Sequence, residues 1–171
     1  MNIQRSFACL LCLLFPFVLN AGADNLPKVD LNADNIGPRP IEQLTSQVIA
    51  RDYANAWQTM AQALDRNNAA PLESYYTGWA KENLTKRIAD QRNSGLHTHY
   101  IDHGHALEAV FYSPAGDLMQ LRDRAQLEIQ ILDGNKVIDQ QQVTLHYVVL
   151  MTPGADRWLV RDLQAIPEGG H

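Results

Sequence analysis

The spacing of apolar residues changes from helical to alternating at Gly95, and this change restricts the folds open to the chain. Before it, apolar residues recur at three- and four-residue steps over Ile41–Leu64, which predicts a long amphipathic helix. After it, the odd positions of Asp117–Leu132 are mostly apolar and the even positions polar, which predicts a strand with one solvated face. Helices followed by strands in one chain of this length predict a single α+β domain.

Two further helical segments and three further strands complete the predicted fold. They are a short helix or turn at Pro71–Tyr76, a helix at Trp79–Asn93, and strands at His97–Tyr112, Val137–Met151 and Arg157–Ile166. We therefore expect a long N-terminal helix and shorter helices packed on a four-stranded antiparallel sheet. The helix at 79–93 is expected to present Trp79, Leu84 and Ile88 to the core, and Gly95 is placed to cap it.

The first 23 residues have the order of features that marks a cleaved secretory signal. Arg5 is followed by the apolar run Phe7–Leu19 and then by the small residues Ala21 and Ala23. The apolar run is shorter than the roughly 20 residues that a membrane-spanning helix needs. We therefore expect cleavage after Ala23 and no membrane insertion afterwards, which predicts a secreted or periplasmic protein.

Composition and the residues that interrupt regular structure predict how the chain is divided into parts. The expected parts are a signal at 1–23, a flexible lead-in at 24–39, one domain at 40–167 and a disordered tail at 168–171. Both cysteines lie in the predicted signal, so the mature chain has no thiol for catalysis or metal binding. Without Arg5, 13 basic side chains face 19 acidic ones, and this balance argues against nucleic acid as a partner.

Three parts of the chain together resemble the nuclear transport factor 2-like superfamily. They are the helix at Ile41–Leu64, the insert Leu72-Glu73-Ser74-Tyr75-Tyr76 and the closing run Asp156–Leu163. The resemblance implies a cone in which a curved sheet wraps around a long N-terminal helix. That superfamily includes isomerase-like and cyclase-like enzymes as well as non-catalytic, protein-binding domains, and no fixed catalytic motif of the enzymes is present here. The tyrosine-rich insert is more similar to the protein-binding members. In this fold class the convex or open face of the sheet often pairs with a second copy, so the resemblance also implies a homodimer as one possible partner state.

Four of the six histidines lie in one predicted strand, at His97, His99, His103 and His105. All four positions are odd, so an unbroken strand would point them to one face. In the plainest interpretation they are solvated or line a cavity and bond to neighbouring polar groups. A second interpretation is a metal site, because a His-x-His pair on a strand can hold zinc, copper or nickel, with Asp102 in support.

Three interpretations of function remain open from the sequence, one of them a metal-binding accessory protein that uses the histidines just named. The first is a non-catalytic domain that binds a protein partner or a small ligand without a cofactor. Its candidate ligand-binding residues are Tyr75, Tyr76, Tyr100, His103 and His105. The second is a cofactor-independent isomerase, dehydratase or cyclase with acid–base chemistry at Tyr100, Asp102, His103 and His105. On a regular strand Asp102 and the histidines lie on opposite faces, so the enzyme interpretation requires a β-bulge.

Overall fold

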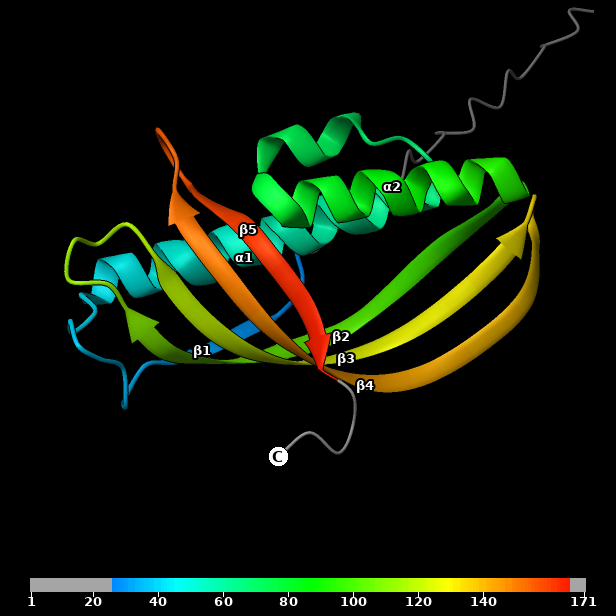
Figure 1. The fold of residues 1–171 in the computed structure, drawn as a ribbon. Helices are drawn as coiled ribbons and strands as arrows, with labels where there is room; N and C mark the ends of the chain where they lie inside the picture. The colour runs from blue at the N-terminus through cyan, green and yellow to red at the C-terminus, as the bar shows by residue number, and fades with distance from the viewer. Residues whose placement is uncertain (1–25, 167–171) are drawn as a thin grey trace, which may run out of the picture.

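The computed structural model describes residues 26–166, in which a curved sheet wraps around one side of the helices (Figure 1). The elements are β1 (Val29–Asn32), α1 (Gln43–Asp65), the 3-10 helix η1 (Ala70–Ser74), α2 (Gly78–Ser94), β2 (Leu96–Tyr112), β3 (Met119–Asp133), β4 (Lys136–Pro153) and β5 (Trp158–Ile166). The strand order is β1-β2-β3-β4-β5, and β2 to β5 form an antiparallel meander. The predicted α+β class and the long helix against a curved sheet are confirmed.

The sheet has five strands, whereas the sequence predicted four. The additional strand, β1, lies in the segment predicted as a flexible lead-in and pairs in parallel with His105–Glu108 of β2. Val29-Asp30-Leu31-Asn32 is too short for its alternation to stand out from a polar segment. Val29–Asn32, within the predicted lead-in, therefore forms an edge strand of the sheet.

The core forms where the apolar stripe of α1 meets the concave face of the sheet. The fully or almost fully buried side chains of α1 include Ile49, Tyr53, Ala56, Trp57, Met60 and Leu64. Met119, Leu121, Ala125 and Leu127 of β3 are buried as the alternation predicted. Each large apolar side chain buried in this way contributes about 1.5–3 kcal/mol to stability.

Helix α2 confirms one expectation and corrects another. Gly95 adopts a left-handed conformation with φ of 73° and caps the helix, as predicted. Trp79, predicted to face the core, is instead 66% exposed. The buried stripe of α2 consists of Ala80, Leu84 and Ile88 at four-residue steps, and Trp79 lies one residue away, about 100° around the helix.

Replacing Trp79 by alanine is expected to change the free energy of unfolding by no more than about 0.5 kcal/mol, because the indole is mostly exposed. Leu84→Ala, on the buried stripe of the same helix, is the control and should cost about 2 kcal/mol. Urea unfolding of both variants measures these values. A loss at Trp79 as large as that at Leu84 would contradict the placement of the stripe.

The ends of the chain bear on several sequence predictions. The predicted signal at 1–23 and the predicted tail at 168–171 lie outside the described residues. Among the helices of residues 26–166, none combines the length and the apolar character needed to cross a membrane.

Candidate binding site

A β-bulge in β2 decides which side chains of the histidine-rich strand face the helices. Asp102 pairs with Leu127 and Gly104 pairs with Gln126, so His103 is the extra residue. Gly104 has a φ of 128°, a conformation that glycine adopts readily, and its N–H donates to Asp102 Oδ1 at 2.8 Å. The bulge thus reverses the alternation, and the four histidines do not share one face as an unbroken strand would require.

Asp102 and His105 consequently lie together on the inner side of the sheet. His105 Nε2 is 2.8 Å from Asp102 Oδ2, and His105 Nδ1 is 2.8 Å from Asp123 Oδ2. The hydroxyl of Tyr53 donates to the same Asp123 oxygen at 2.8 Å. The side chains of His105 and Asp123 are fully buried, and that of Asp102 is 18% exposed. We call these four residues the His105 network.

The network holds His105 in its charged form. Burial lowers the pKa of His105, but its hydrogen bonds to Asp102 and Asp123 and the negative charges of these carboxylates outweigh burial and raise the pKa to about 9. At neutral pH both ring nitrogens therefore carry protons and donate to carboxylates. Burial, followed by the charge of Asp123, raises the pKa of Tyr53 well above 10, so its hydroxyl remains a neutral donor.

Aromatic rings of α1 enclose His105 on the helix side. The Trp57 ring centroid is 4.5 Å from that of His105, and the Tyr53 ring meets His105 edge-on at 5.6 Å. Two buried polar atoms here, Trp57 Nε1 and Asp123 Oδ1, have no hydrogen-bond partner among residues 26–166.

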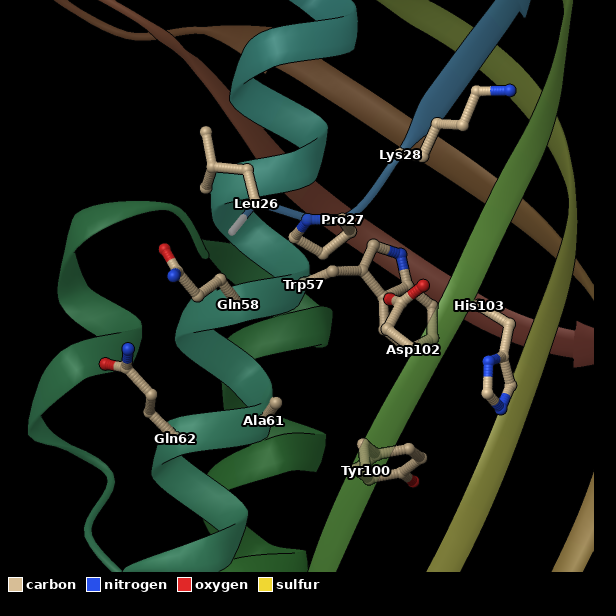
Figure 2. Close-up of a pocket in the computed structure, with 10 residues that line it drawn as sticks. All are labelled: Leu26, Pro27, Lys28, Trp57, Gln58, Ala61, Gln62, Tyr100, Asp102 and His103. Carbon is tan, nitrogen blue, oxygen red and sulfur yellow. The ribbon is translucent and has the colours of Figure 1, made fainter. Parts of the chain in front are cut away.

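Beside the network, a groove of about 530 Å³ lies between α1 and β2 (Figure 2). It is lined by Leu26, Pro27, Lys28, Trp57, Gln58, Ala61, Gln62, Tyr100, Asp102 and His103. Figure 2 shows Trp57 directed from α1 toward β2, and Gln58 and Gln62 on the side of α1 away from β2. Asp102 belongs to both the groove and the His105 network, so the two are directly connected.

The structure brings together only part of the predicted ligand-binding set. Tyr100 and His103 line the groove, and His105 is buried next to it. Tyr75 and Tyr76 do not line this groove. The hydroxyl of buried Tyr76 donates to the Ala56 carbonyl at 3.0 Å, and Tyr75 lies beneath the Arg157 guanidinium.

The bulge turns His105 to the inner side of the sheet, whereas His97 and His99 precede the bulge in β2. His103 is exposed, His105 is occupied by two carboxylates, and His99 Nδ1 lies 3.0 Å from Asp65 Oδ1. Within residues 26–166, no group of three or more His, Cys, Asp or Glu side chains is arranged to hold a metal ion. His97 is half-buried near the start of β2.

Sequence reasoning missed Asp123, Tyr53 and the two glutamines of the groove. For Asp123 a signal was present, because it occupies an odd, inward position in the otherwise apolar series of β3. A carboxylate at such a position must have a buried partner. Gln58 and Gln62 carry no comparable signal, because polar residues are common on the flank of an amphipathic helix.

No family model matches this sequence, and no curated protein matches it. The intermembrane space region of the chloroplast protein ARC6 has a similar structure, with a TM-score of 0.62 and 13% identity over 75% of this chain and 98% of that chain. A putative dehydratase of the NTF2-like family from Streptomyces avermitilis aligns with a TM-score of 0.45 and 10% identity, over 70% of this chain and 96% of that chain. The chain has the nuclear transport factor 2-like fold. At 13% identity the likeness to the ARC6 region concerns the fold, and a fold does not by itself give a function.

Proposed function

We propose that this chain is an exported, non-catalytic domain, secreted or periplasmic, that binds a protein segment or a small ligand in the groove between α1 and β2. One observation carries the proposal. His105, the inward histidine of the site, is fully buried, and both of its ring nitrogens are bound to carboxylates. Its imidazolium has no lone pair with which to take a proton from a substrate.

Asp102, a second candidate group of the enzyme interpretation, is constrained as His105 is. An acid–base catalyst works best with a pKa near the working pH and within reach of the reacting atom. The pKa of His105, at about 9, and its burial meet neither condition. Asp102 already accepts from Gly104 N–H through Oδ1 and from His105 through Oδ2. These carboxylate contacts hold the bulge in place and favour a structural role for Asp102.

The groove itself suits binding. Its lining combines the aromatic rings of Trp57 and Tyr100 with the polar side chains of Gln58, Gln62 and Asp102. Ligand sites commonly have such a mixture of apolar walls and a few polar groups, and its volume lies within the usual range of roughly 300–1,000 Å³. Export is supported by the signal-like order of residues 1–23.

A selection against the mature chain, residues 24–171, tests the proposal. We would screen phage-displayed random peptides and a fragment library, and compare each ligand on wild type and on Ala61→Arg, which fills the groove floor. Ligands are expected to shift the Trp57 indole N–H resonance and to bind Ala61→Arg at least tenfold more weakly. Arg122→Ala, on the outer face of β3, is the matched control and should bind as wild type does. Failure of both libraries to yield an Ala61-dependent ligand would overturn the proposal.

A further inference from the structure

The groove lies beside a part of β2 that has a strand on one side only. β3 pairs with β2 from Leu96 to Tyr112, whereas β1 covers only His105–Glu108. On the β1 side, Leu96–Gly104 therefore has no strand partner among residues 26–166. An uncovered strand edge presents backbone N–H and C=O groups that can pair with another extended chain. Tyr100 and Asp102, which line the groove, belong to this edge.

The alternation of the β2 backbone shows which of its N–H and C=O groups face the groove. The carbonyl of Leu96 accepts from the Asn67 side-chain amide at 2.7 Å, so this residue is directed away from β3. In an antiparallel pair, successive residues alternate between the two edges. Tyr100 and Asp102 have the same parity as Leu96, which directs their N–H and C=O groups to the free edge. Past the bulge the same edge is continued by His105, whose N–H donates to the Lys28 carbonyl at 2.8 Å.

The opposite side of the groove supplies a matching pair of polar groups. Gln58 and Gln62 are four residues apart on α1, which corresponds to a rise of about 6 Å. Two residues of an extended strand span about 6.6 Å, so the two carboxamides, on the rim of the groove, have the spacing of successive side chains on one face of a strand. Each carboxamide can both donate and accept a hydrogen bond. Trp57 and Ala61 lie between, where they contact the side chains on the helix-facing side of such a strand (Figure 2).

We propose that the groove takes an extended segment of a partner polypeptide, which adds to the free edge of β2 in line with β1. The segment is expected to carry apolar residues at alternate positions, toward Trp57 and Ala61, and no proline at positions that face β2. The inference rests on the proposed export, because cleavage after Ala23 leaves only Asp24 and Asn25 ahead of Leu26. Two residues are too few to run along the edge between Leu96, whose carbonyl is bound by Asn67, and Gly104, which lies beside Lys28, so we assign this edge to a separate chain.

A backbone N-methyl scan of a peptide selected on the mature chain tests strand addition. N-methylation removes one donor at a time, so affinity is expected to fall at least tenfold at every second residue and much less between them. Hydrogen exchange should show new protection at the amides of Tyr100 and Asp102 when the peptide binds. The double variant Gln58→Ala, Gln62→Ala should bind about tenfold more weakly, whereas Arg122→Ala should bind as wild type does.

The outcomes separate this inference from the proposed function. Peptide binding that depends on Ala61 but shows a uniform N-methyl profile would overturn strand addition and leave the groove as a binding site. Ligands that are exclusively small molecules would overturn the polypeptide partner. Unchanged exchange at Tyr100 and Asp102 with a bound peptide would likewise contradict pairing on this edge.

Discussion

Replacing His105 by alanine is expected to lower the free energy of unfolding by about 3–5 kcal/mol. The variant leaves the carboxylates of Asp102 and Asp123 without the imidazolium that lies 2.8 Å from each of them. Asp123 is fully buried, so water cannot replace the lost partner. Urea unfolding followed by circular dichroism measures the difference in the free energy of unfolding. If this free energy depends on urea concentration with the same slope in both proteins, the denatured state is unaffected.

His103→Ala is the matched control, because it removes a histidine two positions away that is exposed at the bulge. Its effect should stay within about 0.5 kcal/mol. From the sequence alone both imidazoles were interpreted as solvated or cavity-lining, and solvated imidazoles at both positions would predict a small effect when both are replaced together. Equal, small losses in the two single variants would support that interpretation and contradict the buried network.

Raising the pH from 6 to 9.5 is expected to remove about 3 kcal/mol of stability through His105 alone. Its pKa is about 9 in the folded protein against 6.5 in the unfolded chain, and each unit of difference corresponds to about 1.4 kcal/mol. Because the folded-state pKa is the higher one, this contribution is fully present below about pH 6.5. It is lost as the pH rises through 9, where the folded protein releases the proton.

The pH dependence is measured by urea unfolding at several pH values in wild type and in His105→Gln, which cannot titrate. The difference between the two proteins should shrink by about 3 kcal/mol between pH 6 and 9.5. Keeping the pH below 10 avoids ionising tyrosines of the unfolded chain, which have a pKa near 10. A difference that stays constant over this range would mean that His105 is neutral in the folded protein.

The elements that sequence analysis located well are those with long, regular patterns. The predicted helix at Ile41–Leu64 corresponds to α1 at Gln43–Asp65, because its apolar stripe repeats over six turns. The four strands of the meander were predicted to within a few residues of their observed bounds, because they too have long, regular patterns. β1 was missed because its four residues acquire their structure from pairing with a strand far along the chain.

The site was predicted where its residues are neighbours in sequence and missed where they are not. Tyr100, Asp102, His103 and His105 were identified as one group, and their cooperation was seen to require a bulge, which the structure contains. Asp123 joins His105 from the adjacent strand, and it occupies an inward position whose significance depends on the register between β2 and β3. Register and helix–sheet packing are tertiary properties, so the groove could not be derived from local patterns.

The edge strand β1 also affects how the molecule folds and fluctuates. Val29 pairs with His105, 76 positions later in the chain (29 to 105), whereas each hairpin of the meander joins consecutive strands. Closing so long a loop has an entropic cost, and four paired residues offset only part of it. We expect β1 to dock last during folding and to detach first in native-state fluctuations. Each detachment carries the adjoining Leu26–Lys28 segment off one end of the groove, so access to Trp57 would be governed by the transient opening of a single short strand.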